Sequence, residues 1–305
     1  IRLDGGVQQI KLDKNNEATG LNGNTNNNTF GIVKDLGVEP DTNEWKKVLL
    51  PWTVRASNDD GQFNTFNKEE NNGKPKYSQK YRSRDNNNRN LGDIVNSPIV
   101  AVGGYLATSA NDGMVHIFKK NGGGDDRNYS LKLSYIPGTM PRKDIESKDS
   151  TLAKELRAFA EKGYVGDRYG VDGGFVLRQV NNLNGQDRVF MFGAMGFGGR
   201  GAYALDLTKA DGSDPTAVSL FDVKNDNNGK NSNNSNNSVQ LGYTVGTPQI
   251  GKTHDGKYAA FLASGYATKE ITSGENKTAL YVYDLESSGT LIKKIDVPGG
   301  KGGLS

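Results

Sequence analysis

Cysteine is absent from the 305 residues. The chain therefore has no disulfide, no thiolate zinc site, no iron–sulfur cluster and no cysteine nucleophile. Histidine is nearly as scarce, with His116 on an expected strand and His254 in an expected turn. Two such positions do not give the ligand spacing of a zinc site, so we interpret both residues as structural.

Long apolar runs and catalytic signatures are also missing. No run approaches the ~18 residues of a membrane-spanning helix. A net charge of +3 gives no reason to expect nucleic acid as an obligate partner. There is no G-x-S-x-G, and the glycine run Gly193–Gly201 lacks a Walker lysine and leads into an expected strand. We therefore predict a protein that is not an enzyme.

Asparagine and glycine, in contrast, are abundant, with 33 and 40 residues. Asparagine is concentrated in the polar stretches 15–29, 58–90 and 225–238. Because Asn favours turns and left-handed backbone, we expect these stretches to be loops. Residues 1–90 are interpreted as an N-terminal region that leads into a second region at 91–305.

The second region contains three repeats, near 94–140, 170–223 and 241–297. Each offers four short β-type runs bounded by Gly, Asn or Asp, and its second run ends in small residues. Aligning the third runs places His116, Tyr203 and Tyr281 in register. Four strands per repeated unit indicate an all-β fold, a β-propeller with long inserted loops.

The chain's last residues, GGKGGLS, look like the start of a fourth repeat. Three blades do not close a propeller, since closure usually needs about four or more. We expect the chain to be a piece of a longer protein with further blades.

One or two short helices are expected in the insertions. Leu152, Leu156 and Phe159 share one helical face, which predicts a helix over 151–162 with Ser150 as its N-cap. A second candidate runs over 41–50, where Asp41 precedes an apolar face.

The strongest candidate binding residues form a basic stretch before the first repeat: Lys74, Lys76, Lys80, Arg82, Arg84 and Arg89. With Tyr77 and Tyr81 interleaved, this stretch could bind acidic glycans, anionic lipid or nucleic acid, or be a solvated loop. Asp206 and Asp284 sit at equivalent strand ends, where we expect them to stabilise turns.

Four segments, in chain order, resemble the propeller of the type IV pilus PilY/PilC proteins. They are YRSRDNNNRNLGDIVNSPIVAVG (81–103), GDRYGVDGG (166–174), RVFMFGAMGFGGRGAYALDLT (188–208) and LGYTVGTPQIGK (241–252). The resemblance covers about residues 34–305. LGVEPDTNEWKKVLLPWTVR (36–55) and the Asn-rich insertions resemble the PilC branch.

The resemblance implies a domain of a secreted bacterial protein at the outer membrane, cell surface and pilus tip. Its partners would be pilin or pilus-tip components and the host cell surface. Such proteins promote pilus assembly, oppose retraction, mediate adhesion to host cells and contribute to virulence. The resemblance also implies a calcium ion in a D-x-D-x-D-G-x-x-D loop. No such loop is intact here, so we expect calcium to bind outside this segment.

Two alternatives remain open. ANDGMVHIF (110–118) resembles a blade strand of quinoprotein-type dehydrogenases, although the repeats lack the recurring Trp of that family and the chain has no Cys for a vicinal disulfide. The other alternative is a scaffold propeller of unknown partner.

Overall fold

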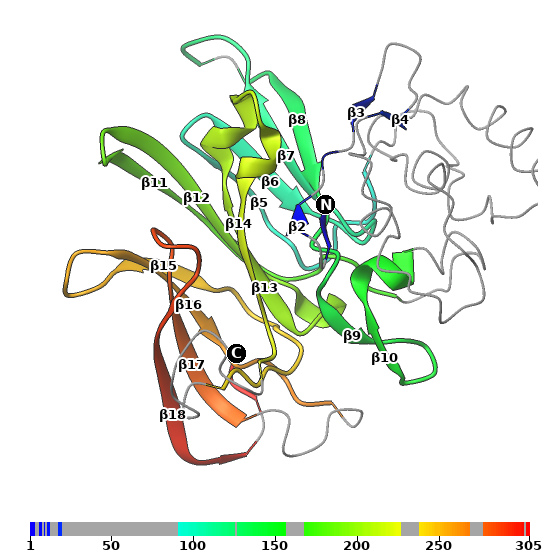
Figure 1. Ribbon diagram of the computed structural model, residues 1–305. Helices are drawn as coiled ribbons and strands as arrows, with labels where there is room; N and C mark the ends of the chain where they lie inside the picture. Colours follow the sequence, from blue (N-terminus) through cyan, green and yellow to red (C-terminus); the bar gives the residue numbers. More distant parts are fainter. Residues whose placement is uncertain are drawn as a thin grey trace, which may run out of the picture.

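Three four-stranded antiparallel sheets stand side by side in the computed structural model of this chain (Figure 1). The structure describes residues 1–3, 6–7, 9, 11–12, 18–19, 91–125, 127–156, 168–226, 238–268, 277–301 and 303–305. We call the three sheets blades one, two and three; in Figure 1, blade one is cyan, blade two green to yellow and blade three orange to red.

The strands of each blade follow one another in the sheet in chain order. Blade one consists of β5 (Ile99–Val102), β6 (Tyr105–Ser109), β7 (Val115–Lys120) and β8 (Tyr129–Tyr135). Blade two consists of β11 (Phe175–Leu183), β12 (Gln186–Ala194), β13 (Gly201–Asp206) and β14 (Ser219–Lys224). Blade three consists of β15 (Gln249–Lys252), β16 (Tyr258–Ala263), β17 (Lys277–Asp284) and β18 (Leu291–Lys301).

These blades confirm the all-β propeller plan. His116, Tyr203 and Tyr281 all lie on third strands, as the alignment of the repeats predicts. The first strands lie innermost, because β11 contacts both β5 and β15. Four-stranded units whose first strands meet near one axis are the arrangement of a propeller.

Apolar residues fill the two spaces between neighbouring blades. Ile117 of blade one and Met191 and Tyr203 of blade two belong to the first core. Phe190 and Phe192 project from the other face of blade two and meet Tyr281 and Tyr283 of blade three in the second core. Because side chains alternate along a strand, blade two supplies both cores from opposite faces.

The insertion between blades one and two differs from the prediction at its start. Ser150 lies in β10 (Asp149–Thr151), which pairs with β9 (Pro141–Lys143), so Ser150 is not the N-cap. Residues 152–156 are helical, and Thr151 Oγ1 accepts a hydrogen bond from the Lys154 N–H at 3.3 Å. The β9–β10 hairpin therefore shifts the cap by one residue. The expected positions from 157 onward and the helix at 41–50 lie outside the described residues.

Short elements complete the described chain. At the N-terminus, β1 (Arg2–Leu3) pairs with β2 (Gly6–Val7), and β3 (Lys11–Leu12) pairs with β4 (Ala18–Thr19). Between blade strands lie the 3-10 helices η2 (Gly196–Gly198), η3 (Leu207–Asp211) and η4 (Pro215–Val218). Val218 ends η4, and β14 begins at the next residue.

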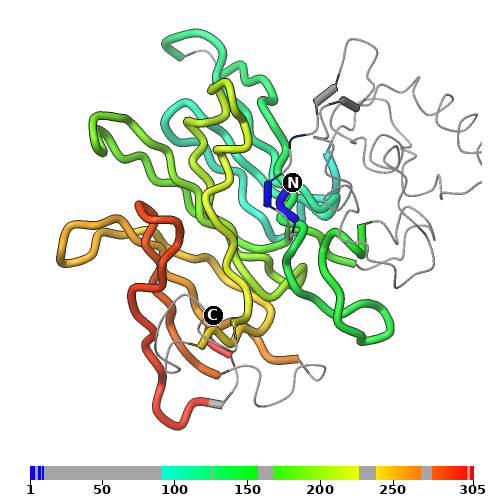
Figure 2. The backbone as a smooth tube through the Cα atoms, in the orientation of Figure 1, coloured from blue at the N-terminus to red at the C-terminus, as the bar shows by residue number. Residues whose placement is uncertain are grey.

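The first and last residues both return to the blades. The Arg2 N–H donates to the Ile136 carbonyl at 3.0 Å, and the blue trace in Figure 2 lies beside the green chain at that point. The end of the chain lies near the yellow segment that precedes blade three (Figure 2), where Ser305 approaches Gly246.

Candidate interaction surface

The blades are joined at one end by the segments that lead into them. Each lead-in segment, 91–98, 168–174 or 241–248, contacts the turn between the second and third strands of its own blade. The bonds run from Asn111 N to Asp93 O at 2.8 Å, from Asp172 N to Met195 O at 3.2 Å, and from Gly242 N to Ser264 O at 2.8 Å. The same kind of contact thus recurs in all three blades.

The same turns also contact the next lead-in segment. Val171 N donates to Ala110 O at 3.0 Å, and Gly196 N donates to Thr244 O at 2.9 Å. In blade three, Gly265 N donates to Leu304 O at 2.8 Å. We call this assembly of lead-in segments and turns the glycine-rich end. The motifs LGDIVNSP, GVDGG, GAMGFGG and LGYTVGTP all lie within it.

Close backbone approach explains the glycines of this end. A Cβ atom at Gly198 would lie 1.7 Å from the Gly170 carbonyl oxygen. Gly196, two residues earlier, has a φ of +58°, in the left-handed region. A side chain at position 198 would separate the lead-in segment of blade two from its own turn.

Asp172 ties the first two lead-in segments together. Both of its carboxylate oxygens accept from Asn96 Nδ2, at 3.1 and 3.0 Å. Burial raises the pKa of the Asp172 carboxyl, and the Asn96 side chain opposes this shift. The two groups are chemically matched, because an amide donor satisfies a buried carboxylate without bringing a second charge.

A buried polar chain crosses blade one. His116 Nε2 lies 2.9 Å from Asp112 Oδ2, and His116 Nδ1 lies 2.8 Å from Ser134 Oγ. Asp112 also accepts from the Gly92 and Met114 N–H groups, each at 3.0 Å. The grouping of Asp, His and Ser resembles a nucleophilic triad, but the imidazole is fully buried. We interpret this series of hydrogen bonds as a structural link that holds β7, β8 and the turn before β7 together.

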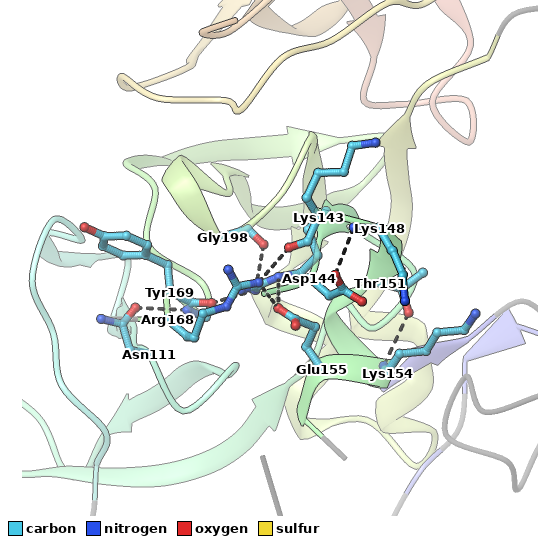
Figure 3. Close-up of polar contacts among 12 residues, drawn as sticks. Asn111, Lys143, Asp144, Lys148, Thr151, Lys154, Glu155, Arg168, Tyr169 and Gly198 are labelled. Carbon is cyan, nitrogen blue, oxygen red and sulfur yellow. Dashed lines mark hydrogen bonds and ion pairs between the residues drawn. The ribbon is translucent and has the colours of Figure 1, made fainter. Parts of the chain in front are cut away.

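A second buried polar group lies in the insertion between blades one and two (Figure 3). Glu155 Oε2 lies 2.7 Å from Arg142 Nε and also pairs with Arg168. The Arg142 guanidinium donates to the Tyr169 and Gly198 carbonyls at 2.6 and 3.0 Å. Burial lowers the pKa of Arg142 to about 10, so the side chain stays charged at neutral pH. This group fixes β9, the helix and the lead-in segment of blade two to one another.

Aromatic rings gather at the glycine-rich end. Phe197 of η2 has its ring centroid 5.6 Å from that of Tyr169, 6.5 Å from that of Tyr243 and 6.3 Å from that of Tyr266. Tyr243 is buried, whereas Phe197 is 41% exposed and Tyr266 is 54% exposed. We call these four residues the aromatic cluster. It is our candidate interaction surface, because large apolar side chains open to solvent usually mark a binding site when they are grouped.

The six cations predicted to bind a partner, Lys74, Lys76, Lys80, Arg82, Arg84 and Arg89, lie outside the described residues. The two aspartates expected to stabilise turns are confirmed in that role. Asp206 Oδ1 accepts from the Thr208 N–H at 3.1 Å, and Asp284 Oδ1 accepts from the Glu286 N–H at 2.7 Å.

Sequence reasoning missed the partners of His116 and the whole aromatic cluster. The spacing of Asp112 and His116 is four residues, and this gave a weak signal for their contact across a turn. No local pattern links Tyr169, Phe197 and Tyr266, since they come from different segments of two blades.

Two further observations concern metal and membrane. Across the described ranges, no three acidic or histidine side chains are grouped as a metal ion would need. In that same part of the chain, no helix has both the length and the apolar character needed to cross a bilayer.

Together, these observations define a β-propeller whose blades are interlocked by glycine-rich lead-in segments. A family model described as the PilY1 beta-propeller domain matches residues 91–305. Since this match spans more than half of the chain, the chain belongs to the PilY1 β-propeller family.

Two proteins named for type IV pilus biogenesis are similar to this chain in sequence. The type IV pilus biogenesis factor PilY1 of Pseudomonas aeruginosa strain UCBPP-PA14 is 29% identical over 208 residues, which are 68% of this chain and 14% of that protein. A PilY1 homolog from Xylella fastidiosa is 29% identical over 196 residues, 64% of this chain and 11% of that protein. The chain thus spans less than a fifth of either relative.

A solved structure is also similar. The crystal structure of the Pseudomonas aeruginosa PilY1 C-terminal domain aligns with 64% of this chain and 30% of its own chain, with 23% identity and a TM-score of 0.38.

Proposed function

We propose that this propeller belongs to a non-enzymatic protein that promotes assembly of type IV pili and opposes their retraction. The observation that carries the proposal is the family match over 91–305, to which curated relatives named for type IV pilus biogenesis add support. The rigid, interlocked blades suit a scaffold that holds binding surfaces in place.

We extend the proposal to adhesion and location. The protein acts at the outer membrane, the cell surface and the pilus tip, contacts pilin or pilus-tip components, and attaches to host cells. Calcium, proposed from the family resemblance, binds outside this segment.

Deletion of the region encoding this chain tests the central proposal. We expect the number of surface pili, counted by electron microscopy, to fall sharply, and to recover when the deleted region is restored. Repeating the deletion in a strain that lacks the retraction motor separates the two parts of the proposal. Pili that return there indicate a role against retraction, and pili that stay absent indicate a role in assembly. Unchanged piliation in both strains would contradict the proposal.

A matched pair of glycine variants links piliation to the fold. Gly198→Ala places a Cβ against the Gly170 carbonyl, whereas a Cβ at Gly123 meets no atom within 4 Å. We expect Gly198→Ala to reduce piliation and Gly123→Ala to leave it unchanged. Equal piliation in both variants would show that the interlocked end is dispensable.

The non-enzymatic part of the proposal has its own test. Purified protein is incubated with pyrroloquinoline quinone and calcium, and an alcohol or aldehyde is supplied with an electron acceptor. We expect no turnover above that of the quinone alone. Measurable dye reduction that depends on the protein would favour the quinoprotein alternative.

A further inference from the structure

We propose that the aromatic cluster is a binding site for a neutral sugar ring, a pyranose of a glycan. This inference rests on the adhesive part of the proposed function and names its ligand class. Four observations carry it: exposure of the rings, rigidity of their backbone, the bonded state of the charged groups described near them, and size.

Exposure is the first observation. Two of the four rings, those of Phe197 and Tyr266, are open to solvent, and their planes are at 85° to each other. An exposed Phe ring in a turn that is otherwise buried brings no gain in core packing. The two rings meet edge to face, with 6.3 Å between their centroids.

Rigidity is the second observation. Tyr243 and Tyr266 exchange two backbone hydrogen bonds, of 3.0 and 2.7 Å, and the Tyr243 hydroxyl accepts from the Lys143 N–H at 3.0 Å. Phe197 is held between Gly196 and Gly198, whose N–H groups donate to Thr244 and Met195. Aromatic side chains on a fixed backbone lose little conformational entropy on binding.

Charge is the third observation. In the part of the chain that the structure describes, the ionic groups within three positions of the cluster are already bonded. Arg168 binds Glu155 and the Lys143 carbonyl, Asp172 binds Asn96, and Arg200 donates to the Leu241 carbonyl. The surface therefore favours an uncharged partner over an acidic lipid, an acidic glycan or a nucleic acid, each of which is attracted by available cations.

Size and chemistry are the fourth observation. A stable protein–protein interface covers about 800 Å² on each partner, with roughly 20–30 residues a side. Four rings, of which one is buried, are far smaller than that. A pyranose presents C–H groups on one face, and these fit the negative face of an aromatic ring. Its hydroxyls can hydrogen-bond to phenol hydroxyl groups, of which Tyr169 and Tyr266 each carry one.

Binding of the purified 305-residue chain to an array of neutral oligosaccharides and their sialylated counterparts tests the proposal. We expect binding to neutral glycans, with equal or weaker binding to the sialylated forms. For the best neutral glycan, titration calorimetry should show at least a tenfold loss of affinity in Phe197→Ala and in Tyr266→Ala. Phe197→Tyr keeps a ring and should retain binding, and Ile292→Ala, which changes an exposed apolar residue of β18, is the matched control.

The opposing results are equally distinct. No neutral glycan bound by the folded chain, or binding that survives loss of both exposed rings, overturns the proposal. An apolar peptide that binds with the same dependence on Phe197 while no sugar binds also overturns it, and assigns the surface to a protein. Melting curves of every variant show whether the fold is retained. The two proposals fail independently, because pilus number after deletion of the region tests the proposed function, whereas glycan binding by the purified Phe197→Ala and Tyr266→Ala proteins tests the sugar site.

Discussion

Blade one and blade two place different residues at the same position of their third strands. In blade one, His116 is joined through both ring nitrogens to Asp112 and Ser134. In blade two, the Tyr203 ring fills the space above Gly193, where a Cβ would lie 2.2 Å from the ring. Burial raises the pKa of the Tyr203 phenol, so the side chain stays neutral.

At this position of the third strand, blade three is more similar to blade two than to blade one. Tyr281 lies opposite Leu262 and stacks with Tyr283, with 6.4 Å between the ring centroids. Its hydroxyl accepts from the Gln240 N–H at 3.0 Å. The difference shows that the propeller plan requires a filled position, which a hydrogen-bonded polar group or a buried aromatic ring can each supply.

The largest effect should come from removing the ring of blade two. Tyr203 is fully buried between blades one and two. Tyr203→Ala should lower the free energy of unfolding by about 3–5 kcal/mol, the usual cost of deleting a buried aromatic ring. Urea unfolding measures this loss. Tyr203→Phe keeps the ring and serves as control, and a loss below about 1 kcal/mol in Tyr203→Ala would show that the ring is not a core element.

A somewhat smaller effect should follow from filling the space beneath that ring. Gly193→Ala should cost about 1–3 kcal/mol of unfolding free energy, because the new methyl group overpacks the core. Gly123→Ala, in open space, should change stability by less than about 0.5 kcal/mol. Combining Gly193→Ala with Tyr203→Leu should cost less than the sum of the two single substitutions, because the new methyl group enters space that the ring has left. An equally stable Gly193→Ala protein would disprove the fit between ring and glycine.

In blade one, we expect a loss of stability when substitutions remove the hydrogen bonds of His116. His116→Ala leaves the Asp112 carboxylate and the Ser134 hydroxyl each short of one partner, which should cost about 1–3 kcal/mol. Ser134→Ala should cost about 0.5–1.5 kcal/mol. Because the two residues share one bond, the double variant should lose less than the sum. Strict additivity in thermal unfolding would argue against a connected polar chain.

The smallest effect should be a pH dependence at the lead-in segments. Burial raises the pKa of Asp172 above that of the unfolded chain, so the folded protein binds a proton at higher pH than the unfolded chain does. Its contribution to stability therefore grows as pH falls through the folded pKa, and is complete below the unfolded value near 3.8. Asp172→Asn should remove this dependence. Melting temperatures of both proteins between pH 7 and 4 measure it, and parallel curves would refute the assignment.

Local features of the sequence predicted much of the fold and little of the candidate site. Tyr258–Ala263, one of the short β-type runs of the third repeat, forms β16. Ser150 was wrongly predicted as a cap, because the pairing of β9 with β10 is not visible in the helical pattern that follows. The aromatic cluster was missed because its four residues are spread over 98 positions, from 169 to 266.

The sequence by itself determined the repeat of four strands, the order of the blades and the positions where only glycine fits. These properties depend on side-chain alternation and backbone conformation, which neighbouring residues control. Only the tertiary structure decided that His116 meets Ser134, that Asn96 meets Asp172, and that Phe197 lies among three tyrosines. Those contacts join segments far apart in the chain, and their geometry exists only once the blades have packed against one another.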